Sequence, residues 1–332
     1  MAPTHWKKLM NEKERDIAIA AVFAAMDVAE RVQHSLQHHH TLTKTDRSPV
    51  TVADFAVQAI VCKLLHDAFP AIPIVGEEEA GELREQKNDA VMQRIVEILR
   101  PLNAGMTPAA VCDWVARGGA QTADRFWTLD PIDGTKGFLR GEQYVVALAL
   151  IADGRVELGV LGCPNLALAQ FDGPAGCLFV ARRGEGVTVV MRDARSLAVK
   201  VSQNHDPAAS RLVESYESGH SDQELQDCVA SALEVQLQRR QLDSQAKYGL
   251  VAAGEAEIYL RIPNRKTWDY KEKIWDHAAG ALIVEEAGGR VSDIHGNPLD
   301  FNHGRLLSAN SGILATNGRN HDRVLAAIKN CL

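Results

Sequence analysis

The chain has 332 residues, enough for two domains or one large domain and for a sizeable buried core. Its 36 Lys and Arg against 43 Asp and Glu give a formal net charge of −7, and 46% of the residues are hydrophobic, as in ordinary soluble globular proteins. This balance excludes a broad polyanion-binding surface, so nucleic acid is not an expected partner, and a phosphate-bearing ligand must be held by local cations or metal ions.

The sequence shows no sign of a membrane-spanning or secreted protein. Its longest uncharged apolar run, residues 144–152, is about half of the roughly 20 residues that cross a bilayer. The N-terminal residues contain no continuous apolar segment of the secretory type. The six cysteines are dispersed without a C-x-x-C pair, which favours reduced thiols over a disulfide framework or a zinc site. We therefore expect a cytoplasmic protein that does not bind membranes.

Helices and one short strand are predicted for the N-terminal segment from the spacing of its apolar residues. The predicted elements are helix 12–37, helix 51–69, strand 72–75 and a polar helix over residues 90–102. Asp54 falls in the first turn of the second helix. The strand ends at Gly76 and runs into Glu77, Glu78 and Glu79, so carboxylates follow a strand end directly.

The rest of the chain changes character twice. A largely antiparallel sheet is expected from strands 126–129, 144–151, 156–163, 168–171, 177–181 and 187–191. Strands then alternate with helices: strand 211–215, helix 222–233, strand 234–237, helix 244–253, strand 258–260, helix 275–287 and strand 289–292. We therefore predict an α+β domain over residues 1–200 and an α/β domain over residues 201–332.

The segment Asp130-Pro131-Ile132-Asp133-Gly134-Thr135 carries the most chemistry. It follows a predicted strand and holds two carboxylates three residues apart beside a Pro and a Gly that shape the backbone. Both carboxylates and the Ile132 carbonyl could turn toward one point, and the amides of Gly134 and Thr135 suit a phosphate oxygen. The alternative is a plain polar turn, because Asp, Pro and Gly are common turn residues.

Other acidic residues have structural alternatives as well. Glu77 belongs to a run of three glutamates that could be a solvated surface, Asp54 could complete a capping box with Thr51, and Asp276 could complement a helix dipole. Their grouping favours function, since a strand-end Glu, a strand-end Asp pair and a helix-start Asp could meet in one cleft between the domains.

Carboxylates gathered in this way require cations. Two of them about 4 Å apart repel by roughly 4 kcal/mol at an effective dielectric constant of 20. Ligands that are all oxygen favour Mg²⁺, and a pair of such ions suits phosphoryl transfer to water. The sequence therefore indicates a metal-dependent phosphatase.

The motifs resemble those of a known superfamily, the Mg²⁺-dependent, Li⁺-inhibited phosphatases that include inositol monophosphatase. The resembling segments are residues 76–78, 130–135 and 275–280, for the three metal-binding motifs, and residues 48–54, for the upstream motif with a water-activating aspartate. The resemblance spans about residues 11 to 320. It implies a layered αβαβα sandwich, two or three Mg²⁺ ions and inhibition by Li⁺.

The resemblance implies a role for each of several residues in the metal site and in catalysis. The implied Mg²⁺ ligands are Glu77, Asp130, the Ile132 carbonyl, Asp133 and Asp276. Asp54, paired with the Thr135 hydroxyl, would orient and deprotonate the attacking water, and the amides of Gly134 and Thr135 would steady the scissile phosphate.

Further segments are similar to the 3'(2'),5'-bisphosphate nucleotidases within this superfamily. They are residues 126–130, 136–144, 213–215, 219–221, 242–248 and 259–261. This similarity implies a monomeric enzyme whose small-molecule substrate is adenosine 3',5'-bisphosphate, cleaved at the 3'-phosphate to give adenosine 5'-phosphate. Whether the 5'-phosphosulfate analogue is also cleaved stays open at this point. The implied nucleoside pocket is Gly219, His220, Asp243 and Ser244, and the implied 5'-phosphate cations are Lys247 and Arg261.

Two other functions stay open at this point. One is an inositol (poly)phosphate phosphatase with the same metal core, and the other is a non-catalytic protein that senses the nucleotide or Mg²⁺. The segment from Asn264 to Tyr270 is longer than is usual in the superfamily, and we expect it to reshape the pocket rim near Arg261.

Overall fold

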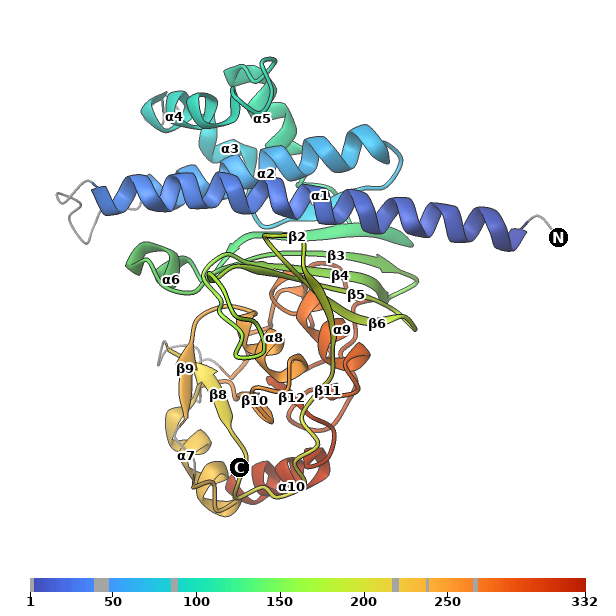
Figure 1. Cartoon of the computed structure of the whole chain (residues 1–332), viewed down its shortest axis with the longest axis vertical. Coiled ribbons are helices and arrows are strands. Elements are labelled where there is room, and N and C mark those ends of the chain that lie inside the picture. Colours follow the sequence, from blue (N-terminus) through green and yellow to red (C-terminus); the bar gives the residue numbers. More distant parts are fainter. Residues whose placement is uncertain (1–2, 39–47, 85–88, 217–220, 237–238, 265–267) are drawn as a thin grey trace.

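Helices and sheets alternate in α/β/α/β/α order in the computed structural model (Figure 1). The structure describes residues 3–38, 48–84, 89–216, 221–236, 239–264 and 268–332. The expected layered sandwich is therefore confirmed. None of the described helices is both long and apolar enough to span a membrane.

The outer helical layer comes from the N-terminal segment. Its elements are α1 (Pro3–His38), α2 (Ser48–Ala68), α3 (Ala80–Leu83), α4 (Asp89–Leu99) and α5 (Pro108–Ala116). Helix α2 begins at Ser48, three residues before the predicted start, so Asp54 lies in the second turn and the capping-box alternative with Thr51 is wrong. The α4 helix is amphipathic and not polar throughout, since Met92, Ile95 and Leu99 are buried. The sequence analysis missed α5, which Thr107 caps by accepting a hydrogen bond from the amide of Ala110 (3.2 Å).

A seven-stranded sheet lies under these helices, with its strands in chain order. The strands are β1 (Ile74–Gly76), β2 (Arg125–Asp133), β3 (Val145–Ala152), β4 (Arg155–Cys163), β5 (Cys177–Arg182), β6 (Gly186–Met191) and β7 (Ser196–Val199). Strand β1 pairs parallel with β2, and the remaining pairs are antiparallel.

Three strand predictions in this sheet need correction. Residues 168–171 form turns, not a strand, and β7 was not predicted. Strand β2 continues through Asp133, with an irregularity of register between Asp130 and Asp133 where a turn was expected. Such an irregularity bends a strand and redirects its side chains, and here it falls on the two candidate metal ligands. Helix α6 (Thr135–Arg140) follows at once.

The C-terminal segment supplies the remaining layers. A five-stranded sheet has the order β11-β12-β10-β8-β9. Its strands are β8 (Leu212–Ser215), β9 (Arg240–Leu242), β10 (Ile258–Arg261), β11 (Arg290–Ser292) and β12 (Ile313–Thr316). Helices α8 (Ala246–Ala252) and α9 (Ala278–Glu286) lie between the two sheets, and α7 (Gln223–Ala232) and α10 (His321–Cys331) cover the far side (Figure 1).

Two predictions in this segment were wrong. The strand expected at residues 234–237 is absent from its described part, because Glu234 has a positive φ (55°) that ends α7; the strand in this region is β9. The helix expected over residues 275–287 is divided at His277 into the short 3-10 helix η4 (Ile274–Asp276) and α9. This division places Asp276 at a bend and not inside a regular helix.

Three hydrophobic clusters hold the layers together. The first joins α1 and α2 to one face of the large sheet, with Met26, Phe55 and Trp127 buried in it. The second joins the other face to α8 and α9. The third lies between the small sheet and helices α7 and α10. Burial of apolar surface on both faces of each sheet explains why its strands read as nearly continuous apolar runs.

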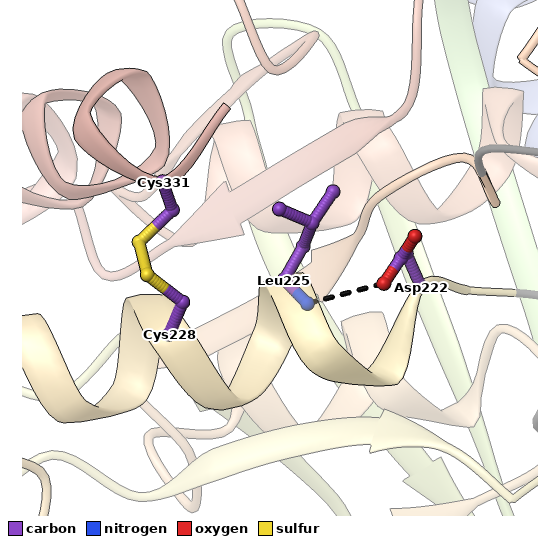
Figure 2. The surroundings of a disulfide bond; sticks show 4 residues. All are labelled: Asp222, Leu225, Cys228 and Cys331. Carbon is purple, nitrogen blue, oxygen red and sulfur yellow. Dashed lines mark hydrogen bonds between the residues drawn. A yellow bond between two sulfur atoms is a disulfide. The ribbon is translucent and has the colours of Figure 1, made fainter.

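Cys228 of α7 and Cys331 of α10 form a disulfide, with their Cα atoms 6.0 Å apart (Figure 2). The expectation that all the cysteines are free thiols is therefore wrong for this pair. The two residues are 103 positions apart, and only the packing of α7 against α10 brings them together. Figure 2 also shows Asp222 capping α7 by accepting a hydrogen bond from the amide of Leu225 (3.1 Å).

Candidate active site

A cavity of about 440 Å³ receives residues from both halves of the chain. Its size is in the range of pockets for small molecules. Carboxylates, cations and the turn after β2 all contribute to its wall. The lining residues that the sequence analysis proposed as site residues are Glu77, Asp130, Ile132, Asp133, Gly134, Thr135, Asp243, Ser244, Lys247, Arg261 and Asp276.

Strands β1 and β2 bring the first carboxylates together. Their parallel pairing sets Gly76 opposite Leu129, so Glu77 and Asp130 emerge side by side at the same edge of the sheet. Their side chains share a hydrogen bond. Asp133 follows at the irregular end of β2, and its Oδ2 accepts a hydrogen bond from the amide of Gln245 (2.5 Å). Two segments that are about 50 residues apart in the sequence thus supply one acidic corner.

Desolvation and mutual repulsion dominate the electrostatics of this corner. The pKa of Asp130, which is 3% exposed, is raised well above its usual value by burial and then by the charges of Glu77, Asp133, Asp276 and Asp54. Burial also raises the pKa of Asp276, and repulsion from Asp133 raises it further. Burial raises the pKa of Glu77 as well, and the charge of Asp133 raises it further. Part of the Glu77 side chain stays accessible to solvent at the cavity. These carboxylates form an acidic cluster that needs a compensating positive charge.

Asp54 lies beside this cluster on helix α2. It is buried, and its pKa is raised well above its usual value by desolvation and then by the charges of Glu78 and Glu77. Among the described residues, the partner of the Thr135 hydroxyl is the Ile132 carbonyl (3.3 Å), not the expected Asp54. The structure therefore brings Asp54 to the glutamates after β1 but shows no hydrogen bond between Asp54 and Thr135.

Asp276 comes from the other half of the chain. Gln245 ties its segment to Asp133, because the Gln245 side chain donates to the Trp275 carbonyl (2.9 Å) and accepts from the Gly280 amide (3.1 Å). The backbone amide of the same Gln245 binds Asp133. One buried glutamine thus sets the position of η4 relative to the end of β2.

The turn that follows β2 depends on glycine. Gly134 has a φ of +88°, and a Cβ added there would lie 2.9 Å from the Cβ of Ser244. Any other residue would therefore be strained and would displace the neighbouring pocket wall. This conformation starts α6 at Thr135 and leaves the first amides of that helix facing the cavity end of β2.

The residues of the acidic cluster fit magnesium. All of their donor atoms are oxygens, from the carboxylates Glu77, Asp130, Asp133 and Asp276 and from the Ile132 carbonyl at the pocket wall. Hard divalent cations prefer such donors. Burial and mutual repulsion raise the pKa values of Asp130 and Asp276, and a divalent cation would offset that repulsion.

Two cations, Lys247 and Arg261, also line the cavity. Lys247 of α8 is 3% exposed, and burial lowers its pKa to about 8; its Nζ donates to the Leu242 carbonyl (3.0 Å). Arg261, at the end of β10, donates from Nε to Glu272 (2.8 Å). The cavity thus combines the acidic cluster with two cations: burial raises the pKa of Asp133, and the charges of Lys247 and Arg261 oppose that rise. This combination suits a ligand that carries a metal-bound group and a second anionic group close to it.

A chain of hydrogen bonds supports Arg261. Glu272 is also hydrogen-bonded to Nε2 of His277 (3.3 Å), and Nδ1 of His277 is hydrogen-bonded to the Tyr248 hydroxyl (2.8 Å). Burial would raise the pKa of Glu272, but the charge of Arg261 and the hydrogen bonds to His277 and Arg261 outweigh burial and lower it to about 2. Burial lowers the pKa of His277 itself. Glu272, Asp276 and His277 place ligand atoms within 4.8 Å of one another, but these contacts already engage two of the three.

The candidate nucleoside residues are only partly described. Gly219 and His220 lie outside the described residues. Asp243 lines the cavity and pairs with Arg140, whose guanidinium lies 4.4 Å from the centre of the Tyr216 ring. Ser244 has a φ of +68°, an uncommon conformation for a residue with a side chain. At the rim, Asn264 and Tyr270 line the cavity, while residues 265–267 between them lie outside the described part.

Sequence reasoning missed several residues that position the site. Gln58 of α2 donates to the carbonyls of Glu78 (2.7 Å) and Val115 (3.1 Å) and accepts from the Glu78 amide (3.0 Å), which fixes the loop after β1. A lone glutamine inside an apolar helical stretch was a usable signal for it. Glu272, in contrast, carries no local pattern, since its role depends on Arg261 and His277 arriving from other elements.

Comparison with known proteins identifies relatives along the whole chain. A family model described as the inositol monophosphatase family matches residues 10–332. A 3'(2'),5'-bisphosphate nucleotidase of Emericella nidulans is 41% identical over 350 residues, covering 97% of this chain and 99% of that protein. A protein of the same name from Schizosaccharomyces pombe is 39% identical over 340 residues, covering 95% of each chain.

Solved structures show the same fold. An inositol monophosphatase from Anabaena superposes with a TM-score of 0.63 at 24% identity, covering 96% of both chains. An inositol monophosphatase from Zymomonas mobilis also gives a TM-score of 0.63, at 20% identity, covering 96% of this chain and 98% of that one.

Proposed function

Because the chain belongs to the inositol monophosphatase family, we propose that its cavity removes the 3'-phosphate of adenosine 3',5'-bisphosphate and releases adenosine 5'-phosphate and inorganic phosphate. The enzyme is a phosphoric monoester hydrolase, as are the curated relatives that share about 40% of its sequence. The observation that carries the substrate assignment is a single cavity lined both by an acidic cluster and by two cations, Lys247 and Arg261.

The acidic cluster would hold the scissile phosphate. We propose that Glu77, Asp130, the Ile132 carbonyl, Asp133 and Asp276 bind Mg²⁺. When bound, Mg²⁺ neutralises the carboxylates and stabilises the charge that develops on the transferring phosphoryl group. The described geometry supports this role through the convergence of four carboxylates on one pocket wall.

Protein groups would complete the catalytic centre. Asp54, beside Glu77 and Glu78, would orient and deprotonate the attacking water. The amides of Gly134 and Thr135, at the start of α6, would donate to phosphate oxygens. In this proposal the Thr135 hydroxyl turns from the Ile132 carbonyl toward Asp54 when the site is loaded.

Lys247 and Arg261 would hold the second phosphate. An ammonium and a guanidinium offer charge-assisted hydrogen bonds to a phosphate that no metal ion contacts. Glu272 accepts a hydrogen bond from Nε of Arg261 and so fixes the orientation of this guanidinium at the cavity wall. Asp243 and Ser244, with Gly219 and His220, would contact the nucleoside between the two phosphates.

A substrate panel tests this proposal. Phosphate release is measured with adenosine 3',5'-bisphosphate, adenosine 3'-monophosphate and inositol 1-phosphate, each with Mg²⁺ and with EDTA. We expect Mg²⁺-dependent release, and a kcat/KM for the bisphosphate at least tenfold above the other two. Equal or higher activity on inositol phosphate would favour the inositol phosphatase alternative. Binding of the nucleotide without any phosphate release would favour the sensing alternative.

Several finer properties are part of the same proposal. We propose two or three Mg²⁺ ions, inhibition by Li⁺, activity also on the 5'-phosphosulfate analogue, a monomeric enzyme and a cytoplasmic location. Cys228 and Cys331, which form a disulfide in this structure, would meet cellular reductants in that location. Mass spectrometry of the alkylated protein, with and without reductant, shows whether that pair is oxidised in cells.

A further inference from the structure

Arg305 contacts two distant segments of the acidic cluster at once. Its guanidinium donates to the carbonyl oxygen of Gly76 (2.7 Å), a residue 229 positions earlier in the chain. The same guanidinium lies 4.7 Å from the centre of the Trp275 ring. Gly76 directly precedes Glu77 and Trp275 directly precedes Asp276, so each contact falls one residue before a candidate metal ligand.

The contact at Gly76 fixes a whole peptide unit. The amide of Glu77 donates to the Leu129 carbonyl (3.2 Å), while the carbonyl of the same peptide unit accepts from Arg305. Because both the carbonyl and the amide of this peptide unit are hydrogen-bonded, the peptide plane between Gly76 and Glu77 cannot rotate without breaking a hydrogen bond. The direction in which Glu77 leaves β1 is therefore set partly by Arg305.

The contact at Trp275 is reinforced by the backbone. The Arg305 carbonyl accepts from the Ile274 amide (3.1 Å), and the Leu307 amide donates to the Glu272 carbonyl (2.9 Å). Lys273 and Leu306 form an antiparallel bridge between these hydrogen bonds. The loop that carries Arg305 thus runs alongside the residues that lead into η4, and its backbone is paired with the segment that carries Asp276.

We propose that Arg305 is a positioning residue that holds the Glu77 and Asp276 segments at the separation required for divalent-cation binding. This inference rests on the proposed metal site and deepens it. A planar guanidinium can donate in its plane to the Gly76 carbonyl while its face covers the Trp275 ring. A lysine ammonium carries the same charge but cannot make both contacts in this geometry, so the role requires arginine.

Mn²⁺ binding to the substrate-free protein tests the proposal independently of activity. The free-ion EPR signal of Mn²⁺ is titrated with the unaltered full-length protein, Arg305→Met and Arg305→Lys. Substitution of a residue that supports a metal ligand typically weakens metal affinity by roughly 10- to 100-fold. We therefore expect Arg305→Met to bind Mn²⁺ at least tenfold more weakly than the unaltered protein. We expect Arg305→Lys to weaken binding at least threefold despite its retained charge.

Arg183→Met provides the matched control. Arg183 is also a partly exposed arginine that donates to a backbone carbonyl, that of Val156 (2.8 Å), and it pairs with Glu285 away from the cavity. We expect this variant to bind Mn²⁺ normally. An equal loss in Arg183→Met, or unchanged binding in Arg305→Met, would contradict the proposal.

The remaining outcomes are also decisive. Normal binding in Arg305→Lys with weak binding in Arg305→Met would assign the effect to charge and overturn the positioning role. If Arg305→Met does not fold, circular dichroism shows it, and the threefold criterion on Arg305→Lys decides alone. Absence of saturable Mn²⁺ binding to the unaltered protein would contradict the proposed function, and the inference with it.

Discussion

Replacing Lys247 by Met should separate recognition of the second phosphate from catalysis. The ammonium is 3% exposed, donates to the Leu242 carbonyl (3.0 Å) and faces the cavity beside Arg261. A charge-assisted hydrogen bond contributes about 1.5 to 3 kcal/mol, so its loss should raise KM for adenosine 3',5'-bisphosphate by about 10- to 150-fold. The substitution preserves length and apolar packing. The kcat, which depends on the acidic cluster, should change by less than about threefold.

Steady-state phosphate release on two substrates measures this effect. Adenosine 3'-monophosphate carries no second phosphate, so its KM should rise less than about threefold in Lys247→Met. Lys63→Met is the control, because Lys63 is a partly buried lysine of α2 that pairs with Asp67 and does not line the cavity. Equal losses on both substrates, or no loss on the bisphosphate, would refute the assignment of Lys247 to the second phosphate.

The pH dependence gives a second check on Lys247. Burial lowers its pKa to about 8, so the free enzyme loses this positive charge as the pH rises through 8. KM for the bisphosphate should then increase by up to about tenfold per pH unit above 8, while KM for the monophosphate should not follow. In Lys247→Met this difference between the two substrates should disappear.

Three further perturbations follow from the structure. Asp130→Asn should raise the thermal midpoint in EDTA at neutral pH, because the pKa of Asp130 is raised in the folded protein and its ionised form is therefore destabilising there. This gain in the thermal midpoint should shrink as the pH falls toward 3.8. With Mg²⁺ present, the substitution should lower the thermal midpoint. Gly134→Ala and Gly184→Ala should each lose about 1 kcal/mol of stability, because both glycines have a positive φ. Only Gly134→Ala should lose activity in the phosphate assay, because its new Cβ would lie 2.9 Å from the Cβ of Ser244 in the cavity wall. Dithiothreitol should lower the thermal midpoint of the unaltered protein, because reduction of the disulfide should cost up to about 4 kcal/mol of stability. The thermal midpoint of Cys228→Ser should not change. An equal shift in both proteins would contradict a role of the disulfide in stability.

Local patterns in the sequence predicted most of the fold. Apolar periodicity found α1 and α2, and short apolar runs between turn residues found β3 to β6. Motif spacing found the acidic cluster, because Glu77 and Asp130 each follow a strand and parallel strands end at one edge. These features depend on residues that are neighbours in the chain.

Features that depend on tertiary packing could not be predicted in this way. Strand β2 continues through Asp133 because β3 pairs with it beyond Pro131, although Pro and Gly indicated a turn. Arg305 meets Gly76 only because the two halves of the chain fold over the same cavity. The disulfide partners likewise meet only through the packing of α7 and α10. No local propensity encodes such contacts.

Anomalous diffraction from crystals soaked in Mn²⁺ and adenosine 5'-phosphate would test the central claim most directly. We expect manganese peaks among the oxygens of Glu77, Asp130, Asp133 and Asp276, with the nucleotide phosphate against Lys247 and Arg261. Manganese bound elsewhere, or a nucleotide phosphate seated away from the two cations, would contradict the account.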